Sequence, residues 1–238
     1  MLYLEIETEA LHFIALHGNE LQEATYHMQP ALNFSRNLRQ ALAMIPSSAS
    51  SEKAVRVLVS NPGTAMPLNE FSEEVMEDVF HHCFREREHE KVFYDMIPEA
   101  NAVWIFGLPR EQSEAIESVF GEVYYASLIA PLARHAFQRP AKSERFMQVY
   151  VRQGWIDLVV LQGNKLLLAN SYAITAPTDA AYYVLGAAKR LQVNQGEDTC
   201  LLLGKAELAA PVAKELKPFL PYLIQESTPT ARLLHYLH

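Results

Sequence analysis

A pair of nearly identical hexapeptides indicates that the chain contains an internal duplication. Residues 16–21 read LHGNEL and residues 161–166 read LQGNKL, so the two copies lie 145 positions apart. The same offset aligns further strand-like residues, namely Leu4 with Val149, Ile6 with Val151, Leu11 with Ile156, Phe13 with Leu158 and Ala24 with Ala169. Matches at one fixed offset are the signature of a repeated structural unit. The chain is therefore expected to fold as two similar lobes.

Each hexapeptide lies in a predicted meander of three strands that a helix follows. In the first copy we predict strands over 2–6, 10–16 and 20–26 and a helix over 31–45. In the second copy we predict strands over 147–153, 155–161 and 165–172 and a helix from Thr178-Asp179, as its N-cap, to 191. Gly18-Asn19 and Gly163-Asn164 are predicted hairpin turns, because glycine accepts a positive φ without cost.

Alternating helices and strands complete both copies. After the first meander we predict a strand over 55–59, a helix over 70–90, a strand over 102–106, a helix over 109–119, a strand over 122–125 and a helix over 128–137. After the second we predict a strand over 199–203, a helix over 206–217, a strand over 221–225 and a C-terminal helix. Val57 aligns with Leu201, and Pro67 with Pro211, at an offset of 144, which we interpret as a one-residue deletion.

Each half therefore reads β-β-β-α-β-α-β-α, which predicts an α/β protein with two mixed sheets. Parallel strands added to a meander need helical crossovers, and these place helices on both faces of the sheet. The polar loop around Arg139 and Pro140 separates the copies. We predict an N-terminal half over 1–138, a linker over 139–145 and a C-terminal half over 146–238.

Composition narrows the classes of partner and compartment. The chain has 238 residues, half of them hydrophobic, which is enough for a sizeable core. A formal net charge of −8 argues against nucleic acid or anionic membrane as a partner. The two cysteines fit no metal or disulfide pattern and suggest buried thiols in a reducing compartment. The acidic N-terminal segment does not resemble a signal peptide, and no apolar run is long enough to span a membrane. We expect a cytoplasmic protein that neither inserts into a membrane nor binds nucleic acid.

Two copies of β-β-β-α-β-α-β-α with a helical connection resemble the actin-like ATPase fold, a duplicated ribonuclease-H-like domain. More narrowly, the chain resembles a bacterial family with a domain of unknown function assigned to that fold. It is also distantly similar to actin-like pilus-assembly and type II secretion proteins, which act as cytoplasmic scaffolds. The resemblance covers nearly the whole chain in the order of its elements.

The resemblance implies where a nucleotide would bind. ATP-binding members carry an Asp-x-Gly turn between the first two strands of each half, with glycine for close approach to phosphate and a carboxylate for Mg²⁺. In this chain residues 5–10 read EIETEA, which keeps acids, including Glu7 and Glu9, but no glycine. Residues 151–157 read VRQGWID, in which Gly154 remains, Arg152 stands near the expected aspartate and Trp155 crowds the phosphate position.

The adenosine motif of the family is also incomplete. A Gly-Gly pair follows the fourth strand in ATP-binding members, whereas this chain has Leu203-Gly204-Lys205. These departures disfavour ATP hydrolysis, and a nuclease reading lacks the carboxylates that two metal ions need. We assign no catalytic residue, no metal site and no cofactor. If a nucleotide does bind, the expected contacts are Glu7, Arg152, Gly154 and Gly204.

Two histidine-containing segments have simpler interpretations than a metal site. His81-His82-Cys83, with His89 beyond, is interpreted as part of a solvated, charged helical face, because no second ligand cluster accompanies it. Residues 84–94 could form a helical arm for a partner. His12 aligns with Asp157 and is predicted to be a strand residue that faces solvent or the cleft between the lobes.

Two pairs of adjacent tyrosines also have a simple interpretation. Packing accounts for Tyr124-Tyr125 and Tyr182-Tyr183 better than a ligand-stacking role does. The sequence therefore favours a non-enzymatic interaction scaffold with a protein partner of unknown identity. Two alternatives stay open. One is an atypical nucleotide-binding ATPase that uses Glu5 or Glu7 with Gly154 and Gly204, and the other is a small-molecule binder at the inter-lobe cleft.

Overall fold

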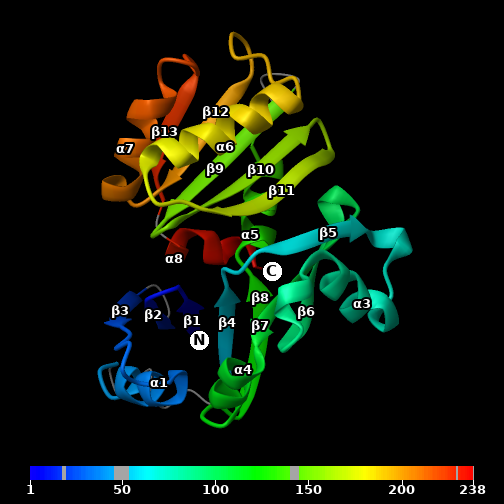
Figure 1. Cartoon of the computed structure of the whole chain (residues 1–238). Coiled ribbons are helices and arrows are strands. Elements are labelled where there is room, and N and C mark those ends of the chain that lie inside the picture. Colours follow the sequence, from blue (N-terminus) through cyan, green and yellow to red (C-terminus); the bar gives the residue numbers. More distant parts are fainter. Residues whose placement is uncertain (18–19, 46–53, 140–144, 229, 238) are drawn as a thin grey trace. The chain divides into compact units, whose positions relative to one another are not determined.

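The computed structural model describes residues 1–17, 20–45, 54–139, 145–228 and 230–237 (Figure 1). The predicted Gly18-Asn19 turn and most of the predicted 139–145 linker lie outside the described residues. The fold forms two compact units, which we describe one at a time. The first comprises Met1–Asn61, Phe71–Asp95 and Ile105–Leu128, and the second comprises Pro62–Glu70, Met96–Trp104 and Ile129–His238.

The first unit contains a mixed five-stranded sheet in the order β3-β2-β1-β4-β8. Its strands are β1 (Leu2–Ile6), β2 (Ala10–His17), β3 (Glu20–His27), β4 (Ala54–Val59) and β8 (Glu122–Ser127). The β1 strand runs antiparallel to β2 and parallel to β4, and β4 runs parallel to β8. Helices α1 (Phe34–Leu42) and α4 (Arg110–Glu117) contact each other. This arrangement is the predicted meander with parallel additions.

The second unit contains a sheet in the same order, β11-β10-β9-β12-β13 (Figure 1). Its strands are β9 (Arg145–Arg152), β10 (Trp155–Gln162), β11 (Lys165–Ala173), β12 (Thr199–Gly204) and β13 (Leu223–Ser227). Helices α6 (Pro177–Arg190) and α7 (Ala206–Leu216) cover one face, and their apolar side chains form a core with Val149, Leu158 and Leu202. Short elements α8 (Thr230–Leu233) and η4 (Leu234–Tyr236) end the chain.

Helix α5 (Ile129–Phe137) packs on the other face of the second sheet. His135 Nδ1 lies 2.6 Å from Gln148 Oε1, and Gln148 Nε2 donates to the carbonyl of Leu132 at 2.8 Å. Burial lowers the pKa of His135, which keeps the imidazole neutral. Its Nδ1–H then donates to Gln148, while Nε2 accepts from Arg139 at 3.3 Å.

No helix within the described residues combines the length and the hydropathy that a membrane span requires.

The pairing registers of the two sheets confirm the internal duplication. Leu4 pairs with Phe13 on β2, and its equivalent Val149 pairs with Leu158 on β10. The fourth strands correct one detail of the predicted alignment. Leu4 also pairs with Val57 and Val149 with Leu202, so the offset stays at 145 and Val57 corresponds to Leu202, not Leu201. Pro67 and Pro211 are not equivalent, because the first ends a strand and the second lies inside α7.

An insertion distinguishes the first copy from the second. Val57 pairs with Tyr125 and Leu202 with Gln225, separations of 68 and 23 positions, so the first copy is longer by 45 residues at this point. The additional elements are β5 (Gly63–Pro67), η1 (Leu68–Glu70), α3 (Glu73–Cys83), η2 (Arg85–Arg87), β6 (Glu90–Ile97), η3 (Pro98–Ala100) and β7 (Ala102–Pro109). Their strands form a separate sheet in the order β5-β7-β6. The strand predicted over 102–106 belongs to this sheet rather than to the repeat.

The helix predicted over 70–90 was wrong in its second half. Helix α3 ends at Cys83, and residues 90–97 form β6, so the proposed helical arm over 84–94 does not exist. Arg87 makes two hydrogen bonds to Glu90, at 2.8 and 2.6 Å, and its guanidinium lies over the rings of Phe80 and Phe84. These contacts reverse the chain after α3 and start the strand, which local periodicity alone does not reveal.

Two helices begin at residues other than those predicted. The first helix begins at Phe34 rather than 31, because Asn33 is its N-cap and accepts a hydrogen bond from the amide of Arg36 at 3.0 Å. Helix α6 begins at Pro177 with Ala176 as the N-cap. Asp179 stabilises this start from the third helical position, where it accepts hydrogen bonds from the amides of Thr175 and Ala176. These bonds hold the pKa of Asp179 below its usual value.

Gly107 on β7 is a point where the insertion has no room for a side chain. A Cβ there would lie 2.4 Å from Glu90 Oε2 and 2.5 Å from Cζ of the fully buried Phe80. We expect Gly107→Ala to lower the free energy of unfolding by about 1–3 kcal/mol through overpacking. Urea denaturation measures the change.

Gly186 provides the matched control, because it lies in α6 and no atom approaches its added Cβ within 4 Å. Gly186→Ala should raise the free energy of unfolding by about 0.5–1 kcal/mol, as expected for glycine in a helix. Equal effects of the two substitutions would contradict the packing described for Gly107.

Candidate functional site

In the second copy, the turn between the first two strands is a tight two-residue hairpin. Gln153 and Gly154 connect β9 to β10, and Arg152 pairs directly with Trp155. Gly154 has a φ of +70°, a conformation that favours glycine, and its carbonyl accepts a hydrogen bond from the amide of Ile174 at 2.8 Å. The glycine that survives here therefore has a local conformational role in the hairpin.

Arg152 is bound to a buried carboxylate. Its Nε donates to Asp157 Oδ2 at 2.7 Å and its Nη2 to Asp157 Oδ1 at 3.1 Å. Ser171 donates its hydroxyl to Asp157 Oδ1 at 2.5 Å. The side chains of Arg152 and Asp157 are only 6% and 1% exposed. The guanidinium also lies over the ring of Trp155, 5.3 Å from its centroid. Both oxygens of the carboxylate are thus used inside the protein.

Gly204 is required by close packing of the backbone. It ends β12 with a φ of +137°, opposite Val151 on β9. A Cβ at this position would lie 2.4 Å from the carbonyl oxygen of Val151. The structure therefore brings three of the predicted contacts, Arg152, Gly154 and Gly204, to one end of the second sheet.

The equivalent turn of the first copy carries glutamates instead. The amide of Glu7 donates to the carbonyl of Ala10 at 3.0 Å, which closes the turn through Thr8 and Glu9. The carbonyl of Glu9 accepts from the amide of Met28 at 2.8 Å, the bond that Gly154 makes with Ile174 in the second copy. Glu7 is half-buried and Glu9 is exposed. Glu7 belongs to the first unit and the other three predicted contacts to the second.

A buried polar pair lies beside this first turn. Glu5 pairs with His12 across β1 and β2, and both are buried, so the prediction that His12 could face solvent was wrong. His12 Nδ1 lies 3.5 Å from Glu5 Oε2, and its Nε2 lies 3.6 Å from Glu23 Oε2. Among the described residues, Glu5 Oε1 has no hydrogen-bond partner. The carboxylates here repel an anion such as phosphate.

Sequence reasoning placed Arg152 at the second turn but missed its partner. Asp157 pairs with Tyr150, which places it diagonally across the hairpin from Arg152 on the same face, and Ser171 pairs directly with Asp157. The hairpin turn already fixes this register in the sequence. The spacing of Arg152 and Asp157 across the predicted hairpin could therefore have predicted their ion pair.

The histidine and cysteine residues do not form a common site. Within the described residues, no three His, Cys, Asp or Glu side chains are grouped so that they could hold a metal ion. His89 lies beyond the end of α3, so it is not part of the helix in which it was predicted. Cys83 is exposed, contrary to the prediction of two buried thiols. Cys200 is buried, and burial raises its pKa to about 12.

Comparisons with known proteins agree with this architecture. A family profile described as "Protein of unknown function (DUF3822)" matches residues 1–223. A search of curated proteins finds no match to the chain. A solved structure from Bacteroides thetaiotaomicron, described as a protein with actin-like ATPase fold and unknown function, is 26% identical with a TM-score of 0.84, covering 94% of this chain and 90% of that one.

Two more distant structures have the same fold. The PilM–PilN type IV pilus biogenesis complex contains a chain that is 15% identical with a TM-score of 0.63, covering 95% of this chain and 87% of that one. Ethanolamine utilization protein EutJ from Carboxydothermus hydrogenoformans is 10% identical with a TM-score of 0.53, covering 99% and 86%. At these identities the likeness extends to the fold alone. The predicted resemblance to actin-like proteins is confirmed at that level.

The ion pair of the second copy gives a direct stability test. Asp157→Asn leaves the buried Arg152 guanidinium without a counter-charge, and breaking a buried pair in this way costs about 3–5 kcal/mol. We expect a loss of that size in the free energy of unfolding, measured by urea denaturation.

The exposed pair of Lys91 with Glu117, 2.8 Å apart, provides the control. Glu117→Gln should change the free energy of unfolding by less than about 1 kcal/mol, because both side chains are solvated. A loss from Asp157→Asn as small as this would show that Arg152 does not depend on its partner.

Proposed function

The chain belongs to the DUF3822 family of proteins of unknown function, and we propose that it is a non-catalytic interaction scaffold on an actin-like ATPase fold. The observation that carries the proposal is the buried pair of Arg152 with Asp157, which lies where a Mg²⁺-nucleotide turn is expected from the fold. The charged groups of this turn are thus bonded to each other inside the protein rather than turned toward a ligand.

The free-energy cost of separating Arg152 from Asp157 also argues against nucleotide binding at the second turn. For Asp157 to bind Mg²⁺, the cation would have to replace Arg152 and the hydroxyl of Ser171. For Arg152 to bind phosphate, it would have to leave a buried carboxylate uncompensated, and an unpaired buried ion costs several kcal/mol. Binding at this turn would therefore start from a penalty of several kcal/mol, which is a large share of the about 8 kcal/mol that a micromolar ligand gains on binding.

The first copy supports the proposal through its charge. Glu7 and Glu9 flank the tip of the turn, and Glu5 and Glu23 lie with His12 behind it. No glycine in this turn lets the backbone approach a phosphate. The negative charge therefore opposes a triphosphate at this turn.

We further propose that the chain binds a protein partner in the cytoplasm. The PilM–PilN structure places a chain of this fold in a complex with another protein, so the fold is compatible with a scaffold role without supplying the partner's identity. The acidic net charge of −8 disfavours nucleic acid and anionic membrane as partners.

Thermal denaturation of the full chain with Mg²⁺ and ATP tests the proposal. A ligand at a hundred times its Kd would stabilise the fold by about 2.7 kcal/mol, which corresponds to a rise in Tm of about 5–10 °C at this chain length. We expect Mg²⁺-ATP to leave Tm where Mg²⁺ alone leaves it. A saturable rise in Tm with ATP concentration would instead identify the chain as an atypical nucleotide-binding protein.

A further inference from the structure

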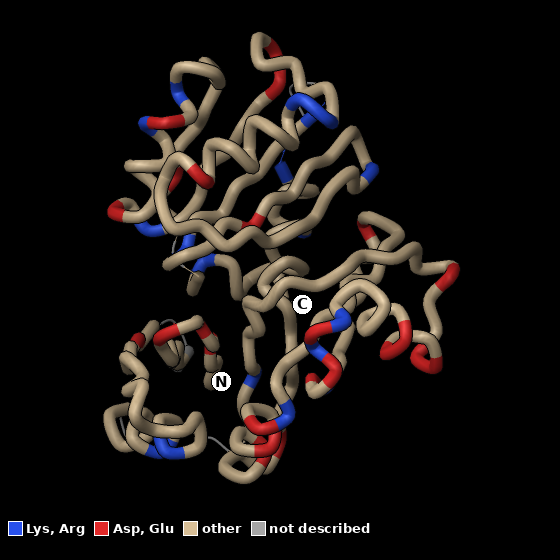
Figure 2. The backbone as a smooth tube through the Cα atoms, in the orientation of Figure 1, with Lys and Arg blue, Asp and Glu red and all other residues tan. Residues whose placement is uncertain are grey.

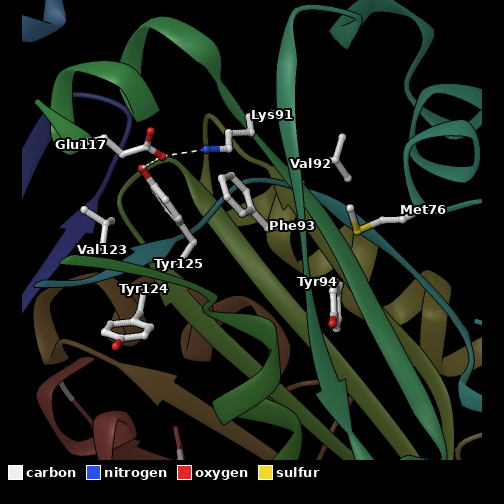
Figure 3. Close-up of a pocket in the computed structure, with 9 residues that line it drawn as sticks. All are labelled: Met76, Lys91, Val92, Phe93, Tyr94, Glu117, Val123, Tyr124 and Tyr125. Atoms are coloured by element: carbon white, nitrogen blue, oxygen red, sulfur yellow. Dashed lines mark hydrogen bonds and ion pairs between the residues drawn. The ribbon is translucent and has the colours of Figure 1, made fainter. Parts of the chain in front are cut away.

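An open groove of about 390 Å³ lies in the first unit, where the insertion meets the repeat (Figure 3). Strand β6 and helix α3 of the insertion form one wall, and β8 with the end of α4 forms the other. In Figure 3, Lys91, Glu117 and the hydroxyl of Tyr125 meet at one end, while Tyr94 and Tyr124 lie toward the other. The groove therefore has aromatic walls with charged groups at its rim.

The repeat alone would not produce this groove. The second copy lacks the insertion, and its edge strand β13 carries Ile224 and Gln225 at the positions of Tyr124 and Tyr125. In the first copy, the Phe93 ring stacks on Tyr125 with centroids 4.2 Å apart. Asp95 Oδ2 accepts a hydrogen bond from the amide of Ser127 at 2.5 Å, which fixes β6 along the edge of β8. The groove is thus formed by contacts that are specific to the first copy.

Each tyrosine of the groove donates its hydroxyl to a glutamate. Tyr94 donates to Glu73 at 2.6 Å and Tyr125 to Glu117 at 3.2 Å, while Tyr124 is bonded to Glu122. Hydrogen bonding to Glu73 and to Glu122 raises the pKa of Tyr94 and of Tyr124, and burial raises that of Tyr125, so all three stay neutral. The ring of Tyr125 stacks on Phe93 and that of Tyr94 packs against Phe71, whereas Tyr124 is 50% exposed and presents apolar ring surface.

The charged residues that line the groove, Lys91 and Glu117, pair with each other, whereas helix α3 beside it is acidic. Helix α3, which contributes Met76, carries acidic residues that are all exposed, namely Glu73, Glu74, Glu77 and Asp78, and Figure 2 shows this acidic helix. Favourable contact with the helix dipole accounts for the first two, at the N-terminus, but not for the others. Among the nearby cations, Lys91 is paired with Glu117, and Arg56 lies close enough to Tyr124 to lower its pKa.

We propose that this groove binds an extended peptide segment of a protein partner in which a basic side chain lies next to apolar ones. The proposal builds on the scaffold role and adds the surface and the chemistry of the partner. Apolar side chains would pack on Met76 and on the half-exposed ring of Tyr124. The basic side chain would lie against a tyrosine ring and a glutamate of the rim, an environment that favours arginine. Tyrosine and methionine are enriched at such interfaces.

The test uses the full chain with ¹³C-labelled tyrosine rings, observed by NMR during titration with the acetylated, amidated pentapeptide LRLRL. The matched probe is LELEL, which has the same apolar side chains and the opposite charge. At about 10 mM peptide, even a millimolar complex is nearly saturated. We expect LRLRL to shift the resonances of Tyr94, Tyr124 and Tyr125 out of the eleven tyrosines, and LELEL to leave them unshifted.

Two substitutions of exposed tyrosines separate the groove from general surface binding. Tyr124→Ala should weaken LRLRL binding about tenfold, whereas Tyr182→Ala, on α6 of the second unit and 76% exposed, should not change it. Both variants should keep the wild-type Tm. No shift with LRLRL, equal shifts with both peptides, or equal binding by Tyr124→Ala would each overturn the groove proposal.

Failure of the groove and failure of the scaffold role give different results. If LRLRL does not bind and Mg²⁺-ATP leaves Tm unchanged, only the groove assignment is wrong. If Mg²⁺-ATP raises Tm while LRLRL still shifts the groove tyrosines, the groove stands and the absence of nucleotide binding is wrong.

Discussion

The guanidinium of Arg152 and the carboxylate of Asp157 are both almost completely withdrawn from solvent, and their mutual attraction is what makes that burial tolerable. A Mg²⁺-nucleotide site at this turn needs a carboxylate that is available to a cation and backbone groups that are available to phosphate. Here the carboxylate is bound to Arg152 and Ser171, and the glycine serves the hairpin. This internal bonding is the basis of the proposal that the turn does not bind a nucleotide.

The two copies have diverged in opposite directions from the same backbone plan. At equivalent positions, the first copy holds Glu5 and His12 where the second holds Tyr150 and Asp157. Glu7 corresponds to Arg152, so the two turns carry charges of opposite sign. The first copy also contains the insertion, which adds a separate sheet and an aromatic groove, while the second keeps the shorter connection through α7. The two copies thus share one sheet order, and the groove lies beside the longer copy.

Much of the architecture could be predicted from the sequence because both meanders are local and strongly patterned. The 145-residue offset identified equivalent residues such as Leu4 and Val149, and the observed pairing keeps that offset through the fourth strands. The boundary predicted at 139–145 stays a prediction. The predicted contacts Arg152, Gly154 and Gly204 do lie at one end of a sheet, but whether a ligand reaches them is a separate question.

The insertion was the part that local patterns could not define. The apolar spacing of α3 continued past its end to Phe84, and the helical arm proposed over 84–94 reached into β6, because Val92, Phe93 and Tyr94 fit either a helix or a strand. What decides is pairing with β7 and the contact of Arg87 with Glu90 and two phenylalanine rings, all of which depend on the tertiary structure. For the same reason the sequence could name Tyr124 and Tyr125 but could not place them in a groove.

A crystal structure of the full chain grown with millimolar Mg²⁺-ADP tests the central claim most directly. Arg152 Nε and Asp157 Oδ2 are expected to remain within hydrogen-bond distance, with no nucleotide density beside Gly154 or Gly204. Density for a diphosphate at that end of the second sheet, with Arg152 turned from Asp157 toward it, would contradict the claim. It would show that the Arg152–Asp157 pair does not prevent nucleotide binding.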